Sequence, residues 1–279
     1  MSYQQIRYEV TRGVAVVTLD RPEKLNAYTP QMGSEIRHAA YAASDDDEVR
    51  IIVITGAGRG FCAGADMKLL QSFSAAGRLP SADDEGTREP IEPIRRVEGV
   101  REDFLTEYTY LMSLPKPVIA AVNGAAAGVG FVLALAADMR FASQSAKLGA
   151  VFSKRGLIAE YGVSWLLPRL VGPAHAADIL FSGKVVSGDE AARIGLVNDT
   201  FPDDGFVDAV VEYAVSIAET ASPRSLRVMK RQLWDDQFNT LAESVDVAVD
   251  EMRKSLKSED FKEGVAHFVE KRAPRFSGR

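Results

Sequence analysis

The sequence predicts an α/β fold in which strands and helices alternate early in the chain and helices alone follow. Short apolar, β-branched runs typical of buried strands are followed by small-residue turns and helical patterns. Over residues 204–272, apolar residues recur at intervals of three and four, the spacing of helices with one buried face. We therefore expect a core over residues 1–200 and a C-terminal helical module over residues 201–279.

The N-terminal part is predicted to contain two strands and a long helix. Residues 14–19 and 51–55 are continuous apolar runs that match buried strands. Residues 29–43 match a helix, because Thr29 suits the N-cap and Pro30 suits the first helical position. These elements begin the predicted core.

A glycine-rich turn at residues 56–60 raises the alternative of a dinucleotide-binding fold. Gly56 and Gly58 follow a strand, as the first glycines of that fingerprint do. The sixth position is Phe61, however, and a second small-residue turn follows at residues 63–64. The spacing disfavours a dinucleotide site.

The middle of the chain combines an irregular segment, a helix and a long apolar unit. Residues 71–99 lack apolar periodicity, so we expect a surface excursion with at most a short helix. Residues 101–113 match a helix that Pro115 and Pro117 end. Residues 118–137 are long enough to span a bilayer, but their internal turn residues favour a buried strand followed by a buried helix.

Shorter elements complete the predicted core. Residues 139–142 and 147–150 match short strands, and helical patterns begin at Ser164 and again at Pro173.

Composition argues against several classes of function. The net charge of -6 disfavours nonspecific nucleic-acid binding, although a local basic patch near Lys271 stays open. Cys62 is the single cysteine, which fits a reducing, cytoplasmic compartment, and a small buried residue is favoured over a thiol nucleophile. The three scattered histidines have no metal-ligand spacing, so we expect no metal site. We also expect no signal peptide and no membrane partner.

Two segments have the pattern of an anion-stabilising site. Residues 61–66 and residues 118–130 each run from a strand through a small-residue turn to a helix start, which leaves backbone N–H groups free. If the two turns meet, two N–H donors point at one carbonyl oxygen, and such an oxyanion hole suits an enolate or tetrahedral anion. The alternative is that both turns merely pack tightly.

Two further motifs lie at residues 21–27 and 167–172. Together with these two turns, and in the same order along the chain, they make the sequence resemble the crotonase family of enoyl-CoA hydratases and isomerases. The resemblance covers residues 6–272. It implies a spiral of ββα units whose helical tail covers the active site and drives assembly into a homotrimer or a dimer of trimers. It also implies an acyl-CoA substrate, with coenzyme A as part of that substrate and no separate cofactor.

The resemblance implies roles for individual residues around the substrate. The N–H groups of Ala65 and Val129 would hold the thioester oxygen. Val129 replaces the glycine usual in the family but keeps its N–H group.

Five further residues match coenzyme-binding positions of the family. Lys24 and Leu25 match a loop that borders the adenosine and pantetheine, and Ala63 belongs to the first turn. Phe268 and Lys271 match a tail helix that reaches the nucleotide bound by a neighbouring subunit, where a lysine suits a phosphate. The alternative is that the two lysines are ordinary surface residues.

The chain departs from the hydratases of this family at both catalytic glutamates. Val132 and Phe152 stand at those positions, and neither transfers a proton. Eight residues after Phe152, Glu160 stands where double-bond-shifting members carry Asp. Its apolar neighbours favour a raised pKa, which suits an acid/base catalyst. The alternative is a surface glutamate at a helix start.

Two other carboxylates are interpreted as structural. Asp66 could be a catalytic acid, but a carboxylate in a first helical turn is more often a cap on free N–H groups. Asp138 is interpreted as a partner of the nearby backbone or of Arg140.

The leading hypothesis is an enoyl-CoA isomerase with Glu160 as its single acid/base. One alternative is an enoyl-CoA hydratase that uses Glu160 alone. Another is a non-catalytic acyl-CoA-binding or RNA-binding member, of which the RNA reading is disfavoured by the negative charge.

Overall fold

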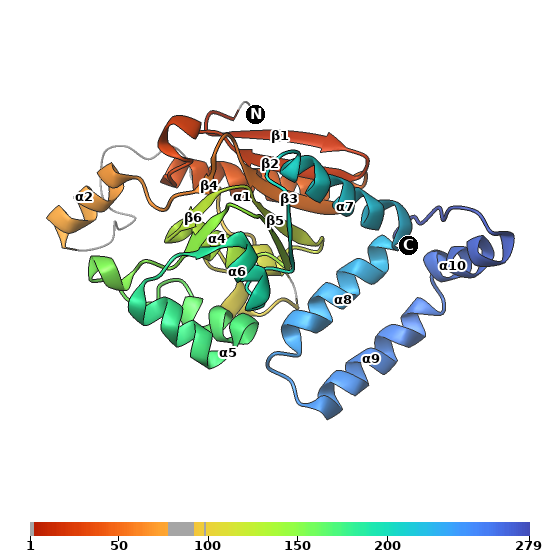
Figure 1. Ribbon diagram of the computed structural model, residues 1–279. Helices are drawn as coiled ribbons and strands as arrows, with labels where there is room; N and C mark the ends of the chain where they lie inside the picture. The colour runs from red at the N-terminus through yellow and green to blue at the C-terminus, as the bar shows by residue number, and fades with distance from the viewer. Residues whose placement is uncertain (1–2, 78–91, 98) are drawn as a thin grey trace.

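The computed structural model describes residues 3–77, 92–97 and 99–279, in which strands form two sheets (Figure 1). The larger sheet has the order β1-β2-β3-β5-β7-β10, and the smaller has the order β4-β6-β8-β9. The strands of the larger sheet are β1 (Ile6–Thr11), β2 (Val14–Leu19), β3 (Ile51–Gly56), β5 (Val118–Val122), β7 (Met139–Ser143) and β10 (Asp199–Phe201). Those of the smaller sheet are β4 (Gly60–Cys62), β6 (Ala125–Ala127), β8 (Lys147–Gly149) and β9 (Val186–Ser187).

Helices surround and extend beyond these sheets. Those of the core are α1 (Pro30–Asp45), α2 (Met67–Ala76), α3 (Tyr110–Ser113), α4 (Val129–Leu135), α5 (Val163–Ser182), α6 (Gly188–Arg193) and α7 (Phe206–Thr220). Short 3-10 turns are η1 (Pro22–Lys24), η2 (Glu102–Phe104) and η3 (Ser153–Arg155). The tail contains α8 (Pro223–Asp235), α9 (Leu241–Ser255) and α10 (Glu259–Glu270). The predicted α/β core with a helical tail is therefore confirmed, while the division at residue 200 stays a prediction.

The larger sheet is parallel except for the hairpin of β1 and β2, and both of its faces are covered. Ile51 and Val53 of β3 belong to the apolar cluster that includes α7. Ile52 and Ile54 belong to the cluster on the opposite face, which includes α1. Burial on both faces explains why β3 is a continuous apolar run rather than an alternating one.

Helix α1 begins where its sequence predicts. The Thr29 side chain accepts a hydrogen bond from the Met32 N–H at 3.1 Å, and Pro30 is the first helical residue. This cap satisfies one of the free N–H groups at the helix start.

The predicted helix over residues 101–113 is wrong. The structure has η2, a turn, and only the short α3 in this segment. The Thr109 hydroxyl donates to the Asp103 carbonyl at 3.1 Å, and the Thr106 N–H donates to the Thr109 side chain at 3.3 Å. Side-chain bonds to the backbone thus compete with the helical pattern here.

Two other segments differ from the sequence-based expectations, and part of a third lies outside the described residues. Strand β1 was not predicted, because an edge strand with mostly exposed side chains has no apolar run. Residues 125–127 form β6 rather than the start of a helix, because they pair with β4 and β8. Of the predicted excursion over residues 71–99, the first part continues α2 to Ala76, and residues 78–91 lie outside the described residues.

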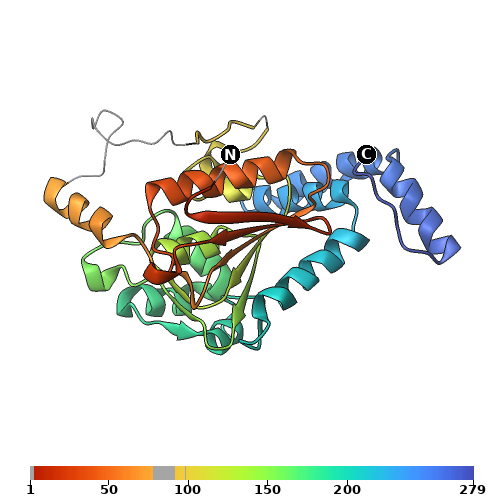
Figure 2. The same ribbon diagram turned by 90° about the horizontal axis from the view of Figure 1, so that it is seen from above.

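The tail helices extend away from the two sheets, with α9 and α10 farthest out (Figures 1 and 2). Helix α8 is anchored to the core through Lys230, whose ammonium lies 2.8 Å from the Asp138 carboxylate. Lys230 also donates to the carbonyls of Leu111 at 2.8 Å and Lys116 at 3.0 Å. A buried ammonium therefore fastens the first tail helix.

Asp138 has the structural role that was predicted, with a different charged partner. It accepts hydrogen bonds from the Val118 N–H and the Trp234 indole, both at 2.7 Å. Arg140 is not its ion-pair partner, because the buried guanidinium instead donates to backbone carbonyls, including that of Ala137 at 2.7 Å. Burial in this apolar environment lowers the pKa of Arg140 to about 10.

None of the helices in the described part of the chain has the length and apolar character needed to cross a bilayer.

Candidate active site

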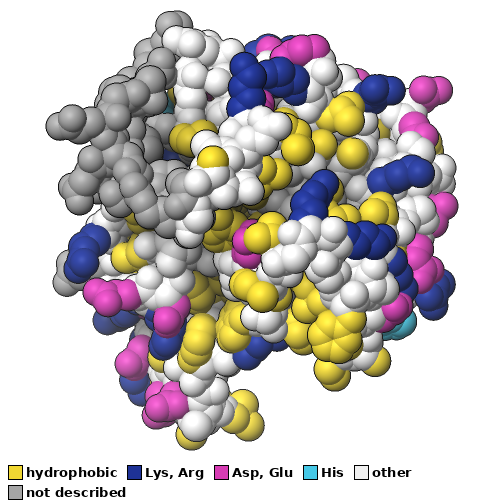
Figure 3. All heavy atoms as spheres, turned by 90° about the vertical axis from the view of Figure 1, so that its left-hand side faces the viewer, with side chains coloured by type: hydrophobic (Ala, Val, Ile, Leu, Met, Phe, Trp, Pro, Cys, Tyr) yellow, Lys and Arg dark blue, Asp and Glu magenta, His cyan; other side chains and the backbone are white. Residues whose placement is uncertain are grey.

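A pocket of about 420 Å³ lies between the start of α2, the start of α4 and the loop that follows β8. Figure 3 shows this face of the molecule, where hydrophobic side chains gather near its centre among charged ones. The residues that line the pocket are Lys24, Ala27, Ala63, Gly64, Ala65, Asp66, Met67, Lys68, Leu70, Gly128, Val129, Phe152, Arg155, Leu157 and Glu160. Five of the eight predicted site residues line this pocket. The other three, Leu25, Phe268 and Lys271, do not.

The two small-residue turns meet in this pocket. Gly64 has a φ of 109°, and a Cβ atom at this position would lie 3.1 Å from the Ala127 carbonyl oxygen. Gly128 has a φ of 51°, and a Cβ atom there would lie 3.9 Å from the Gly64 Cα. The turns therefore approach each other through backbone atoms, and glycine supplies both the conformation and the space.

Close packing behind the turns fixes the start of α4. A Cβ atom at Gly130 would lie 2.0 Å from the Cys62 carbonyl oxygen, so the helix lies directly on the backbone of β4. Val129 is the first residue of this helix, where an N–H group has no acceptor within the helix. Neither its N–H group nor that of Ala65 donates a hydrogen bond to any residue that the structure describes. Both donors are thus free beside the pocket.

The loop that carries Lys24 is tied to β4 through a buried amide. The Asn26 side chain donates to the carbonyls of Gly60 at 2.7 Å and Ala57 at 3.0 Å, and it accepts the Arg21 N–H at 2.8 Å. This network places Lys24 at the pocket. Leu25, in the same loop, does not line the pocket.

Asp66 has the contacts that the cap hypothesis predicts. Its carboxylate accepts the Lys68 N–H at 3.0 Å and the Arg21 guanidinium at 2.9 Å, and it lies 3.6 Å from the Lys24 ammonium. The Arg21 hydrogen bond and then the Lys68 N–H lower the pKa of Asp66. A carboxylate held in its charged form by these donors is a poor proton donor.

Three pocket-region side chains have no acid/base role. Cys62 is fully buried, and burial raises the pKa of its thiol to about 11, which disfavours a nucleophilic thiolate. Val132 is buried in α4, and Phe152 contributes an apolar ring to the pocket. The positions of the two hydratase glutamates are therefore apolar in the folded chain.

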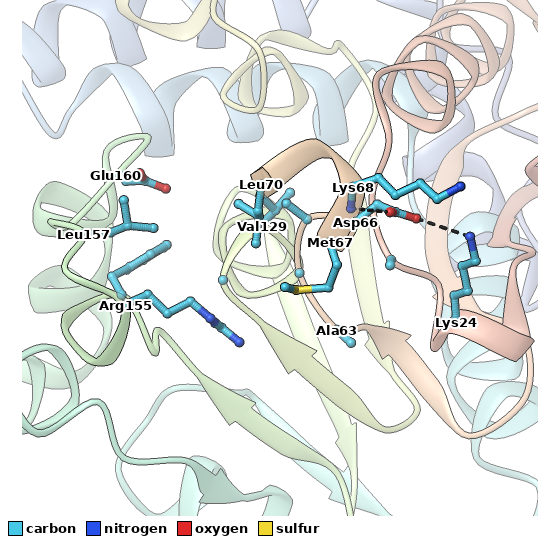
Figure 4. A pocket seen from close by; sticks show the side chains of 15 residues that line it. Lys24, Ala63, Asp66, Met67, Lys68, Leu70, Val129, Arg155, Leu157 and Glu160 are labelled. Carbon is cyan, nitrogen blue, oxygen red and sulfur yellow. Dashed lines mark hydrogen bonds and ion pairs between the residues drawn. The ribbon is translucent and has the colours of Figure 1, made fainter. Parts of the chain in front are cut away.

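Glu160 is half-buried, and its carboxylate points into the pocket from the wall opposite Asp66 (Figure 4). Burial raises its pKa, which favours proton exchange closer to neutral pH. Glu160 precedes α5, whose N-cap is Gly162, so it lies outside the first helical turn. The neighbouring Tyr161 has a φ of 52°, and its ring packs edge-on against Tyr108 with centroids 4.7 Å apart.

The structure separates the two tail residues from the pocket. Phe268 and Lys271 lie at the end of α10, and the Phe268 side chain is 80% exposed. Neither residue lines the pocket of its own chain. Their contact with coenzyme A requires a neighbouring subunit and stays a prediction.

Sequence reasoning did not identify Arg155 as a site residue. It lies at the end of η3, and its guanidinium extends into the pocket (Figure 4). No periodicity or cap signal distinguishes it from the adjacent Lys154, which does not line the pocket. Within the described ranges, no group of three His, Cys, Asp or Glu residues is placed to hold a metal ion.

Comparison with known proteins gives consistent matches over nearly the whole chain. The family model described as "Enoyl-CoA hydratase/isomerase" matches residues 9–279. A 1,2-epoxyphenylacetyl-CoA isomerase from Escherichia coli is 36% identical over 270 residues, which span 97% of each chain. A probable enoyl-CoA hydratase from Rhodobacter capsulatus is 38% identical over 280 residues, with 100% of both chains covered. The crystal structure of a putative enoyl-CoA hydratase from Streptomyces coelicolor superposes with a TM-score of 0.84 at 33% identity, covering 100% of this chain and 96% of that chain.

Proposed function

Because the chain belongs to the enoyl-CoA hydratase/isomerase family, we propose that it shifts a double bond within an enoyl thioester of coenzyme A. One observation carries this proposal. Two carboxylates line the described pocket, and Asp66 is held in its charged form by cationic and backbone donors. Glu160 is the other, and its raised pKa suits an acid/base catalyst.

The proposed reaction needs one carboxylate and one anion-binding site. Glu160 takes a proton from C2 of a 3-enoyl thioester, and the electron pair spreads over the thioester oxygen and C4. The N–H groups of Ala65 and Val129 hold the negative oxygen of this dienolate. Glu160 then returns the proton at C4, which leaves a 2-enoyl thioester and the original carboxylate.

The fixed donors suit this intermediate for a physical reason. The α-proton of a thioester is weakly acidic, so the anion needs stabilisation as it forms. Backbone N–H groups fixed by close packing need no reorganisation, and each is typically worth about 3–4 kcal/mol of barrier. The contacts of Gly64 and Gly130 provide such packing here.

A hydratase that activates water with Glu160 alone is the second candidate. It is favoured by the naming of the Rhodobacter capsulatus relative as a probable enoyl-CoA hydratase. Phe152 and Val132 argue against hydration by two carboxylates, because neither side chain can position or deprotonate water.

Substitution of Glu160 by Gln tests the proposal. Gln keeps the size of the side chain but cannot exchange a proton. We expect Glu160→Gln to bind acyl-CoA almost as the wild type does and to lower turnover of a 3-enoyl thioester about 10²–10⁴-fold. The matched control is Glu9→Gln, the same change on the exposed edge strand β1, and it should retain full activity. Wild-type turnover in Glu160→Gln would overturn the assignment of the acid/base.

An isotope experiment separates the two reactions. In deuterated water, the wild type should convert a 3-enoyl thioester with less than full incorporation of deuterium, because one carboxylate carries the same proton from C2 to C4. If the wild type only adds water to a 2-enoyl thioester, the chain is a hydratase rather than an isomerase. Glu160 would then remain the proposed acid/base.

A further inference from the structure

Arg155 is a charged pocket residue that the proposed reaction does not use. It belongs to the loop between β8 and α5, which also carries Phe152, Leu157 and Glu160 along one wall of the pocket. Its guanidinium extends into the pocket toward Met67 (Figure 4). It makes no ion pair or side-chain hydrogen bond in the structure of the described chain. A cation therefore faces the pocket without a partner.

The other pocket cations are arranged differently. Lys24 lies 3.6 Å from the Asp66 carboxylate, so its charge is partly neutralised. Lys68 extends from the same wall as Asp66, away from the wall of Arg155 (Figure 4). Arg155 also does not tune Glu160, because burial alone accounts for the raised pKa of that carboxyl. The unpaired guanidinium is thus available to a ligand.

The placement of these charges suggests which part of the substrate Arg155 faces. Lys24 and Lys68 lie on one wall, where cations suit the phosphates of coenzyme A. The free N–H groups of Ala65 and Val129 belong to the two turns at which the thioester oxygen would bind. The acyl chain then extends toward the wall of Arg155.

We infer that Arg155 binds a carboxylate at the far end of the acyl chain, so that the preferred substrates are coenzyme A thioesters of dicarboxylic acids. The inference rests on the proposed function, because it assumes an acyl-CoA in this pocket. A planar guanidinium binds a carboxylate through two parallel N–H···O bonds. Phe152 beside it is apolar and buried, whereas Arg155 and Leu157 are exposed in the single chain, so a ligand carboxylate can reach the guanidinium from the pocket. A methyl-ended chain would leave the guanidinium unpaired.

Binding of saturated thioesters tests this inference independently of catalysis. Saturated acyl-CoA cannot be isomerised, so its affinity does not depend on whether Glu160 transfers protons. Calorimetry would compare methyl-ended and carboxylate-ended acyl-CoA over a series of chain lengths. At the best length, we expect the wild type to bind the carboxylate-ended thioester about 10- to 100-fold more tightly.

Variants assign the preference to one side chain. Arg155→Met should abolish the preference without weakening binding of the methyl-ended thioester, and Arg155→Lys should give an intermediate preference because it keeps only the charge. Lys68→Met is the matched control, and it should leave the ratio of the two affinities unchanged. Circular dichroism would show that each variant is folded.

Two results would overturn the inference. One is equal affinity of the wild type for both kinds of thioester at every chain length. The other is an Arg155→Met variant that loses affinity for both kinds equally, since the guanidinium would then contact coenzyme A itself. A wild-type protein that binds carboxylate-ended thioesters more tightly but does not isomerise 3-enoyl thioesters would reject the proposed reaction and leave this inference standing.

Discussion

Val129 contributes a backbone N–H group to the pocket, and its side chain is incidental to that role. As the first residue of α4, it has no helical acceptor for this N–H. Ala65 contributes its own free N–H from the neighbouring turn. At this scale the proposed chemistry depends on two main-chain donors and one carboxylate.

A proline at position 129 tests the main-chain donor. We expect Val129→Pro to lower kcat about 10²–10³-fold, because proline has no N–H group, yet it suits the first position of a helix. Val129→Gly keeps the donor and should retain or raise activity. Steady-state kinetics would measure both variants, with circular dichroism as the check on folding. A folded proline variant with full activity would show that this N–H does not bind the substrate.

The loop between β8 and α5 carries both a carboxylate, that of Glu160, and a cation, the guanidinium of Arg155. Phe152 lies near the start of this loop, and its carbonyl accepts the N–H groups of Arg155 at 2.9 Å and Leu157 at 3.1 Å. The same short loop therefore holds the proposed acid/base, a cation and an apolar wall. A rearrangement of this loop would therefore move the Glu160 carboxylate and the Arg155 guanidinium together.

Among the elements, α8 illustrates how a tail helix is attached to the core. Lys230 of α8 is almost fully buried, and its ion pair with Asp138, which directly precedes β7, joins α8 to the larger sheet. Burial lowers the pKa of Lys230, while the Asp138 carboxylate opposes that change. The Lys230–Asp138 ion pair is thus one of the contacts that hold α8 on the core, together with the hydrogen bond from the Trp234 indole to the same carboxylate.

Removal of this ammonium should loosen α8. Lys230→Met leaves the Asp138 carboxylate without its cation, although the Val118 and Trp234 donors remain. We expect the free energy of unfolding to fall by about 2–4 kcal/mol. Urea unfolding would measure the change. Lys257→Met, on the exposed tail, should change stability by less than about 0.5 kcal/mol, and equal losses in the two variants would contradict the anchoring role of Lys230.

At the scale of the whole molecule, the tail presents apolar side chains that the single chain leaves uncovered. Leu233 of α8, Leu241 of α9 and Phe268 of α10 are each at least 70% exposed. Figures 1 and 2 show α9 and α10 extending beyond the sheets. Large apolar side chains exposed on three successive helices of the tail are typical of a surface that packs against another protein.

We therefore expect the chain to form a trimer or a dimer of trimers in solution. Light scattering at micromolar concentration would measure the mass. Leu241→Asp should dissociate the trimer, because a charge would be buried in the tail interface. Phe181→Asp is the matched control, since Phe181 of α5 is also 81% exposed but lies outside the tail, and it should leave trimers intact. A stable wild-type monomer that binds coenzyme A would contradict the roles of Phe268 and Lys271.

The sequence by itself determined the features that depend on neighbouring residues. The apolar runs of β2 and β3, the Thr29 cap of α1 and the periodic tail all have local causes, namely burial, capping and helix periodicity. The small-residue turns around Gly64 and Gly128 were recognisable for the same reason. Each of these features follows from a short segment of chain.

Only the tertiary structure decided which of these segments meet. It paired residues 125–127 with β4, and it shortened the helix predicted over residues 101–113 to the single turn of α3. It brought Arg155 into the same pocket as Glu160. It also placed Phe268 away from the pocket of its own chain. Such contacts join residues distant in the sequence, and they depend on how closely two backbones approach, which local periodicity and capping do not encode.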